Sequence, residues 1–385
     1  MNILIVTDFF PNFERPHEGL FVWEEVKELK RRHSVVVIVP RYWYPPLKRY
    51  GAFRISLANI PPVEKQNGVR ILRPVYRQVP ILGEWVYPYW FFLKVLFFLS
   101  IYAVKFDLIH THWAYRSGWW AVLLGRLLRK PIVFTTRGSD INYWMNESIK
   151  KGRIRWALSH ASGIIFISQK LVNKIKSAGI RLKKSVVIAN GIPAERYPKP
   201  IQRTFPAFSE KQILFIGNLF PVKGADRLLD ALSLLKRKST NWRASLIGDG
   251  PEKQKLKRKT TSLGLNENVV FLGRLSNPEA MAKLETADVL IIPSRNEGGP
   301  LVLIEALALG KTVVAFNVGN VADVLNRPEL GYLVRKETPE ALAEAILQAL
   351  RSPVDAKLAR KRAEDFLLKI TIPQIEEFYQ KVLFE

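Results

Sequence analysis

Short apolar runs rich in β-branched residues recur along this 385-residue chain, and segments of helical length separate them. The first two runs cover residues 3–7 and 35–39, with a helical pattern over residues 20–32 between them. Strands that are apolar on both faces are typical of parallel sheets covered by helices on each side. The alternation therefore predicts a parallel α/β fold.

The length predicts two domains, because single hydrophobic cores stop growing well below this size. Residues 192–208 contain four prolines and show no periodicity, so we interpret them as the linker. The predicted domains are residues 1–195 and 208–360, followed by C-terminal helices over residues 361–385 that Pro373 interrupts.

Composition and charge limit the function. The chain has no cysteine, which excludes disulfides, thiolate metal sites and cysteine nucleophiles. Because residues 3–7 already form a strand, no signal peptide is expected and a cytoplasmic location is predicted.

The positive charge is unevenly distributed. The whole chain has 59 basic and 34 acidic residues, a net charge of +25. Up to residue 200 the counts are 32 and 12, a net of +20, and the remainder has 27 and 22, a net of +5. An excess confined to one domain suggests an anionic partner, for which nucleic acid and anionic lipid headgroups are the two candidates.

Residues 85–106 are aromatic and apolar, but Pro88 and Lys94 break a stretch already short of the roughly 20 apolar residues that span a bilayer. Two interpretations stay open. The segment is either a buried helix before the strand at residues 108–110 or a face that lies on a membrane.

The N-terminal half offers few site candidates. Gly19, in the loop after the first strand, either allows close approach of a ligand or serves a turn, and no GxGxxG stands there to bind a dinucleotide. His110 and His112 share one face of an extended segment. We expect no metal on them, since no third ligand stands at a telling spacing. Two interpretations are considered: one histidine reaches the binding crevice, or both histidines are structural.

The second half begins with a strand, a glycine turn and a helix over residues 212–236. Gly217 and the pair Lys223-Gly224 precede the helix, a plausible phosphate cradle because exposed N–H groups and the helix dipole favour an anion. The order of residues is not that of a Walker motif. Gly248 and Gly250 form a lone Gly-x-Gly, a weak signal.

A second strand, glycine turn and helix covers residues 287–310. Glu297 stands beside Gly298 and Gly299 in the turn, and Glu305 lies in the otherwise apolar helix. Taken alone, the two acids fit solvent-facing residues, or an acid and base pair as in glycoside hydrolysis. Glycines beside an acid at a strand end also fit a ligand site.

Taken together, these motifs resemble a known family over nearly the whole chain: the retaining glycosyltransferases of the two-Rossmann (GT-B) group, of the glycosyltransferase family 4 (group 1) type. The residues that carry the resemblance are Asp107-x-x-His110-x-His112, Asn190-Gly191, Gly217-x-Leu219, Lys223-Gly224, Gly248-Asp249-Gly250, Phe271-x-Gly273, and Ser294-x-x-Glu297-Gly298 with Glu305-Ala306 and Gly310. The resemblance implies two Rossmann-like domains that face a central cleft, with the C-terminal helix returning to the N-terminal domain.

The resemblance also implies roles. The second domain would bind a nucleotide-sugar and the first an acceptor. Glu305 would accept hydrogen bonds from ribose hydroxyls, Glu297 would contact the donor sugar, and Lys223 would neutralise the diphosphate. The implied catalytic residues are Glu297, Lys223, Arg137 and His112. The implied donor-binding residues are Gly19, Gly217, Asn218, Lys223, Gly248, Arg274, Glu297, Gly298, Gly299, Pro300, Leu301 and Glu305.

The family retains anomeric configuration, and the leaving phosphate helps to take the acceptor proton. The resemblance therefore implies no metal, no protein nucleophile and no cofactor beyond the nucleotide-diphosphate sugar, which is a substrate. The absence of an Asp-x-Asp motif agrees with this.

The chain departs from the family pattern at three places. Asn218 stands where the family often has Arg, and Arg137 stands where it often has His. The paired glycines after the strand at residues 312–316 are here Gly319-Asn320, and Asp323 replaces the usual Glu.

Sugar transfer to a glycan or lipid-linked acceptor, in polysaccharide or glycolipid biosynthesis, is the predicted function. The alternatives are a nucleotide-sugar epimerase of related fold and a basic, non-catalytic binding module. We expect an anionic membrane surface as a partner of the basic domain, a peripheral position at the inner face of the membrane, and no nucleic acid.

Overall fold

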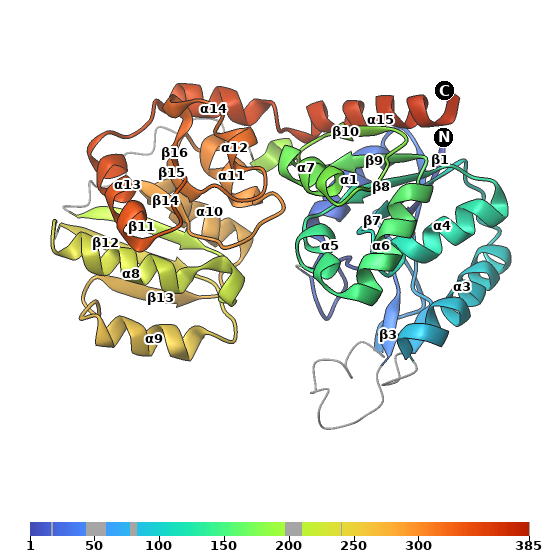
Figure 1. Cartoon of the computed structure of the whole chain (residues 1–385), viewed down its shortest axis with the longest axis horizontal. Coiled ribbons are helices and arrows are strands. Elements are labelled where there is room, and N and C mark those ends of the chain that lie inside the picture. The colour runs from blue at the N-terminus through green and yellow to red at the C-terminus, as the bar shows by residue number, and fades with distance from the viewer. Residues whose placement is uncertain (17, 44–58, 78–82, 197–209, 240, 385) are drawn as a thin grey trace. The chain divides into compact units, whose positions relative to one another are not determined.

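A computed structural model describes residues 1–384 apart from 17, 44–58, 78–82, 197–209 and 240. The chain divides into two compact units, Met1–Ala189 with Thr371–Glu385, and Asn190–Ile370. Each unit has its own parallel sheet with helices packed on it (Figure 1). The predicted α/β fold with two parallel-sheet domains is confirmed.

The unit boundaries differ from the predicted ones at two places. Residues 190–195 belong to the second unit, where Ile192 forms a parallel bridge with Leu367. Of the C-terminal helices, residues up to Ile370 belong to the second unit, and those from Thr371 on return to the first. Most of the predicted linker, at residues 197–208, lies outside the described residues.

The first unit is built on an eight-stranded sheet of order β10-β9-β8-β7-β1-β2-β5-β4, in which only β4 is antiparallel to its neighbour. Its strands are β1 (Asn2–Val6), β2 (Ser34–Ile38), β4 (Val63–Gln66), β5 (Val69–Leu72), β7 (Leu108–His112), β8 (Ile132–Thr136), β9 (Gly163–Phe166) and β10 (Ser185–Val187). A separate parallel pair consists of β3 (Arg41–Trp43) and β6 (Val75–Arg77).

Helices cover the strands of this sheet because its central strands are buried along their whole length. They are α1 (Leu20–Lys30), α3 (Gly83–Ile101), α4 (Ser117–Leu128), α5 (Ser139–Asn142), α6 (Ser148–His160), α7 (Gln169–Ser177) and the long α15 (Leu368–Phe384).

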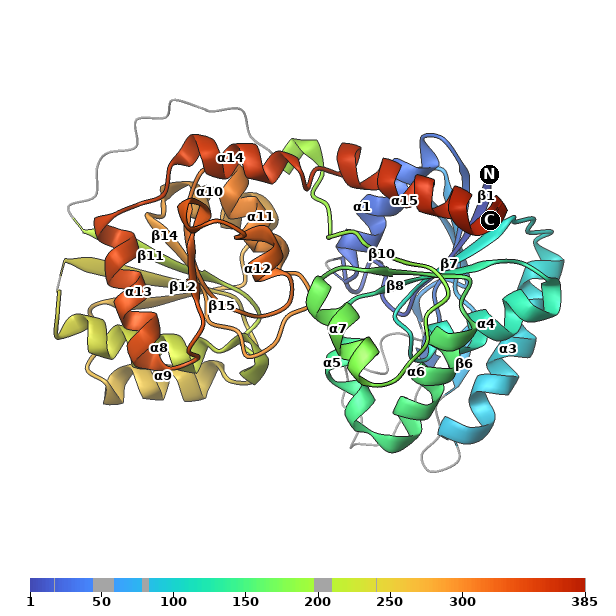
Figure 2. The ribbon, with the colours of Figure 1, turned by 45° about the horizontal axis from the view of Figure 1, so that its top comes forward.

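The aromatic segment at residues 85–106 includes most of α3, of which the structure describes the side chains from Tyr89 on. Phe91, Val95 and Leu99, spaced four apart, are buried in the core of the first unit. Figure 2 shows α3 beside α4 on the flank of this unit. One face of the segment is therefore core, as the first interpretation expects. Within the described part of the chain, no helix is both long and apolar enough to cross a membrane.

The second unit has a six-stranded, fully parallel sheet of order β13-β12-β11-β14-β15-β16. Its strands are β11 (Lys211–Ile216), β12 (Trp242–Ile247), β13 (Val269–Gly273), β14 (Val289–Ile292), β15 (Thr312–Phe316) and β16 (Tyr332–Val334). Its helices are α8 (Ala225–Lys236), α9 (Lys253–Ser262), α10 (Asn277–Thr286), α11 (Leu301–Ala308), α12 (Val321–Val324), α13 (Pro339–Arg351) and α14 (Ala356–Glu364). Thr338 caps α13 through its side chain, which accepts a hydrogen bond from the N–H of Ala341.

The return of α15 to the first unit rests on specific contacts. The buried Tyr379 hydroxyl lies 2.6 Å from Nδ1 of His110 on β7, and we assign Tyr379 as the donor of this hydrogen bond. Glu376 accepts hydrogen bonds from Arg32 and His33 at the end of α1. Gly163 of β9 leaves room for Phe378, since an added Cβ would lie 2.8 Å from that ring.

We predict that Tyr379→Phe lowers the free energy of unfolding by about 1–3 kcal/mol, because the change leaves Nδ1 of the buried His110 without its donor. Urea denaturation measures the difference. The matched control is Tyr143→Phe, since Tyr143 is 65% exposed and its loss should leave the midpoint unchanged. Equal midpoints for Tyr379→Phe and wild type would show that this hydrogen bond does not hold α15.

Candidate active site

In the second unit, the loops that carry the predicted residues meet at one edge of the sheet. All six strands run parallel, so the turns after β11, β12, β14 and β15 emerge at the same carboxyl edge. The strand order changes direction between β11 and β14, which are hydrogen-bonded neighbours. In open parallel sheets, ligands bind outside the carboxyl ends of the strands at such a reversal.

Lys223 and Glu297 join the two loops on either side of this reversal. Lys223 Nζ lies 2.7 Å from Glu297 Oε1, and the Ser294 hydroxyl donates to the same oxygen at 2.8 Å. The Lys223 side chain is 30% exposed and that of Glu297 is 11% exposed. The ammonium group is thus held at a fixed place and remains open to solvent on one side.

Glycines allow these loops to approach one another. A Cβ on Gly224, which has a φ of 69°, would lie 2.0 Å from the carbonyl oxygen of Pro293. A Cβ on Gly248, with a φ of 142°, would lie 1.9 Å from the carbonyl oxygen of Gly217. Both positions therefore exclude any side chain, and the conformations themselves favour glycine. The loops after β11, β12 and β14 depend on them for their spacing.

The N-terminus of α11 borders the same turn. Gly298 and Gly299 are partly exposed, and Pro300 precedes Leu301 as an N-cap that offers no side-chain hydrogen bond. The first N–H groups of such a helix are available to an anion or a hydroxyl oxygen. Glu305 is 5% exposed and lies on the buried side of α11, one turn further on.

Asn320 is a residue of this site whose role the sequence did not predict. It is 1% exposed, and neither its side-chain nitrogen nor its oxygen has a hydrogen-bond partner among the described residues. Its Nδ2 lies 3.0 Å from where a Cβ of Gly299 would stand. Asn190 approaches from another side and donates from Nδ2 to the Gly299 carbonyl at 3.2 Å. Two asparagine amides therefore flank the turn that carries Glu297.

Asn218 and Arg274 lie at the carboxyl ends of β11 and β13, and both are exposed. Arg274 is close enough to Asp249 to contribute to lowering the pKa of that carboxyl, although Lys253, at 2.7 Å, is the main cause. Gly248 lies between these strands, and its N–H bonds to the Gly273 carbonyl. All predicted donor residues except Gly19 thus belong to the second unit, on the turns of the carboxyl edge or, for Leu301 and Glu305, on α11 behind one of them.

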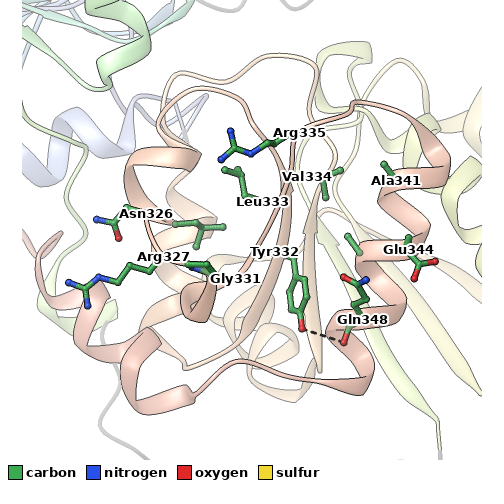
Figure 3. Close-up of a pocket in the computed structure, with 13 residues that line it drawn as sticks. Asn326, Arg327, Gly331, Tyr332, Leu333, Val334, Arg335, Ala341, Glu344 and Gln348 are labelled. Atoms are coloured by element: carbon green, nitrogen blue, oxygen red, sulfur yellow. Dashed lines mark hydrogen bonds between the residues drawn. The ribbon is translucent and has the colours of Figure 1, made fainter.

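A separate groove of about 590 Å³ runs along the edge strand β16 (Figure 3). Arg327, Tyr332, Arg335 and Gln348 line it, together with apolar side chains of β16 and α13. None of the predicted site residues lines this groove. We therefore place the candidate site at the strand-order reversal.

In the first unit, Gly19 lies directly before α1 with a φ of 68°. A Cβ there would stand 2.4 Å from the carbonyl oxygen of Phe9. Gly19 therefore lets the chain pack against the backbone of its own loop. This agrees with the interpretation of Gly19 as a turn residue.

His112 and Arg137 meet in a buried polar cluster at the ends of β7 and β8. The Arg137 guanidinium donates to Nδ1 of His112 at 2.8 Å and pairs with Glu25 of α1, also at 2.8 Å. Nε2 of His112 faces Oε1 of Glu25 at 3.7 Å, and neither atom has a hydrogen-bond partner among the described residues. Because Nδ1 accepts from Arg137, we assign the proton of His112 to Nε2.

Both histidines of this cluster are held neutral. Burial lowers the pKa of His110 to about 3, and the nearby Arg137 adds to the effect. Burial and Arg137 also hold the pKa of His112 well below its usual range. His110 is saturated by two partners, Thr135 at Nε2 and Tyr379 at Nδ1. His110 is therefore structural, whereas His112 keeps one unsatisfied N–H.

A third potential metal ligand, which no sequence spacing indicated, lies beside the two histidines. Glu25 comes from helix α1, and its carboxylate lies within 4.8 Å of ligand atoms on His110 and His112. The Arg137 guanidinium, however, already holds both Glu25 and His112, and it supplies the positive charge that a metal would bring. This donor set fits a metal poorly.

The sequence contains a signal for Glu25. Its neighbours on the buried face of α1 are Val22, Trp23, Val26 and Leu29, so an acid at that position breaks an apolar pattern. A buried acid requires a partner. Since that partner is 112 positions away, the pattern could predict a pairing but not its identity.

The loop after β7 shows backbone strain beside this cluster. Trp113 and Arg116 have φ values of 68° and 53°, a region that residues other than glycine rarely adopt. The buried Asp140 carboxylate accepts from the N–H of Ala114 and from that of Gly138, both at 3.0 Å. Strain of this kind is found at functional sites. The strain makes this loop a functional candidate within the first unit.

We predict that His110 and His112 do not titrate between about pH 8 and pH 5, because each buried ring stays neutral there. Histidine ring signals in NMR, assigned with His110→Gln and His112→Gln, follow both groups. A lowered folded-state pKa stabilises the fold above about pH 6.5, and this contribution is lost as the pH falls toward 3. A midpoint near pH 6.5 for either ring would contradict the assignment.

Family models match both halves of the chain. "Glycosyltransferase Family 4" matches residues 19–196, and "Glycosyl transferases group 1" matches residues 200–366. A Bacillus subtilis protein assigned to teichuronic acid biosynthesis, the glycosyltransferase TuaC, is 30% identical over 90% of this chain and 88% of its own length.

Solved structures show the same fold. Sucrose-phosphate synthase of Thermosynechococcus elongatus has a TM-score of 0.79 at 20% identity, covering 99% of both chains. HepE of Anabaena in complex with UDP has a TM-score of 0.74 at 22% identity, covering 99% of this chain and all of that one, and its UDP-glucose complex has a TM-score of 0.72. The comparisons give no support to the epimerase alternative. With two parallel-sheet units and both family models matched, the chain belongs to the group 1 glycosyltransferases of family 4.

Proposed function

We propose that this glycosyltransferase moves a sugar from a nucleotide-diphosphate donor to a glycan or lipid-linked acceptor, with retention of anomeric configuration and without a metal. The observation that carries the proposal is the Lys223–Glu297 pair at the strand-order reversal of the second unit. The pair holds a cation at the same sheet edge as the N-terminus of α11, and a diphosphate requires positive groups of this kind. The HepE complexes with UDP and UDP-glucose support a donor of this class.

In the proposed reaction the bond between the anomeric carbon and the phosphate oxygen breaks, and the acceptor oxygen bonds to the same face of that carbon. The acceptor proton passes to the departing phosphate, so charge and atoms balance without a protein nucleophile. Negative charge grows on the diphosphate in the transition state. Lys223 Nζ, held at 2.7 Å from Glu297, would stabilise that charge with little rearrangement.

The remaining residues of the edge have binding roles in this proposal. Glu297 is bonded to Lys223 and Ser294, and its position beside Gly298 lets it contact donor-sugar hydroxyls. Glu305 would accept hydrogen bonds from the ribose, and Arg274 would contact the base. The Arg137–His112 pair and Gly19 would serve the donor and acceptor from the first unit.

The charge of the first 200 residues, a net +20, supports an anionic partner for that unit. We propose an anionic membrane surface in this role, with a cytoplasmic, peripheral location at its inner face and no binding of nucleic acid. Polysaccharide or glycolipid biosynthesis is the proposed setting, which the teichuronic acid assignment of the Bacillus relative supports.

The test is transfer from a panel of nucleotide-sugars beginning with UDP-glucose. We predict that a true donor raises the melting temperature, that transfer persists in EDTA, and that product NMR shows retention. Lys223→Ala should lower kcat by about 10² or more, because a fixed cation is lost from the leaving group.

The control for that variant is Lys238→Ala, which removes an exposed lysine of the same unit that pairs with Glu344. Full activity of Lys223→Ala would refute the diphosphate role. Efficient isomerisation of the donor sugar without acceptor would favour the epimerase, and an inverted product would refute retention.

We also propose that Asn320 binds the donor, because a buried amide without partners beside Gly299 costs stability until a ligand satisfies it. Asn320→Ala should then leave the ligand-free melting temperature unchanged or raised, and lower kcat/KM for the donor about 5- to 150-fold. Asn326→Ala, an exposed asparagine of the same unit, is the control. A lower melting temperature with unchanged kcat/KM would mean that Asn320 is structural.

A further inference from the structure

Helix α3 is apolar on both of its faces, although it lies on the surface of the first unit. Phe91, Val95 and Leu99 face the core. The opposite face shows another apolar stripe, in which every side chain is more than half exposed: Tyr89, Trp90, Leu93, Phe97 and Ile101. A helix that is hydrophobic all round is normally buried on all sides. Large exposed apolar surfaces of this kind mark interaction sites.

The stripe continues onto the neighbouring helix α4. Tyr89 contacts the Trp119 ring edge-on, with 5.1 Å between the ring centroids. At the other end, α3 finishes at Ile101, just before β7, and α4 finishes just before β8. Because β7 and β8 are parallel neighbours, both helix ends lie at the same edge of the sheet. Leu127 and Leu128 of α4, 59% and 40% exposed, therefore extend the apolar surface at that edge.

Cations border the stripe at both ends. The Arg153 guanidinium lies 5.6 Å from the centre of the Trp119 ring. At the sheet edge, Lys105, Arg126 and Arg129 are exposed beside the ends of α3 and α4. Residues 83–131 contain six basic side chains and two acidic ones, a net charge of +4. The surface thus combines exposed aromatics and aliphatics with a basic margin.

Two occupants could cover such a surface, a lipid bilayer or a second copy of this chain. The charges separate them. Two copies would bring together chains whose first 200 residues each carry a net +20, and like charges oppose that contact. An anionic headgroup layer attracts the same cations, while the acyl boundary below it accepts apolar side chains. Since no described helix can cross a membrane, α3 would lie in the interface.

We propose that the exposed face of α3, with the end of α4, is the docking surface of this enzyme for an anionic lipid bilayer. Leu93, Phe97 and Ile101 enter the headgroup and acyl boundary, and Lys105, Arg126 and Arg129 contact the lipid phosphates. This assignment gives a structural basis to the membrane proximity in the proposed function. It does not depend on which donor or acceptor the enzyme uses.

Flotation of the full chain with vesicles tests the proposal. Wild type should float with phosphatidylcholine vesicles that contain phosphatidylglycerol and stay behind with pure phosphatidylcholine, and salt should weaken binding. The triple variant Leu93→Ser, Phe97→Ser, Ile101→Ser should partition at least about tenfold less, because three apolar side chains no longer leave water. Lys105→Gln with Arg126→Gln should weaken binding to the anionic vesicles alone.

The matched control is Val270→Ser, Leu358→Ser, Ile370→Ser, which removes three exposed apolar side chains from the second unit and should float like wild type. Thermal melting and UDP-glucose binding of each variant show that folding and the donor site are intact. Flotation of the α3 variant at the wild-type level, or no binding of wild type to anionic vesicles, overturns the proposal. Analytical ultracentrifugation tests the second occupant, another copy of this chain. A wild-type dimer with a monomeric α3 variant would assign the surface to that contact instead of a bilayer.

Discussion

The close approach of the backbone turns at the carboxyl edge of the second sheet is the constraint on which the candidate site depends. Gly224 lies against the Pro293 carbonyl and Gly248 against that of Gly217, at distances that no side chain could tolerate. This contact brings the turn after β11 next to the turn after β14. Lys223 and Glu297 then fall within 2.7 Å of each other, although 74 positions separate them in the chain.

In the first unit, the main constraint is the burial of charged side chains. Glu25 and Arg137 are almost completely inaccessible, and each would be costly without the other. Burial raises the pKa of Glu25, and the guanidinium opposes that shift. The pair also orients His112, whose remaining N–H faces the Glu25 carboxylate. Arg137, where the family often has histidine, is therefore accommodated by an acid on a distant helix.

The Lys223–Glu297 pair and the Glu25–Arg137–His112 cluster differ in their exposure to solvent. The apolar stripe of α3 is a third kind of surface. In the second unit, the charged pair is partly open, so its cation can meet a ligand. In the first unit, the charges are enclosed, and Tyr379 ties the returning helix α15 to the same network through His110. The exposed stripe of α3 belongs to neither cluster.

Local sequence determined the alternating strands and helices, the turn glycines, and the candidates Lys223, Glu297 and Glu305. It could do so because strand periodicity, helix caps and glycine turns depend on neighbouring residues. Only the tertiary structure decided that β11 and β14 are neighbours at the reversal, that Glu25 pairs with Arg137, and that Asn320 lies unpartnered against Gly299. The tertiary structure also decided which face of α3 packs in the core. Both faces are apolar, so the sequence shows no hydrophobic periodicity that would identify the buried one. These features depend on contacts between residues far apart in the chain, 112 positions in the case of Glu25 and Arg137, which no local pattern encodes.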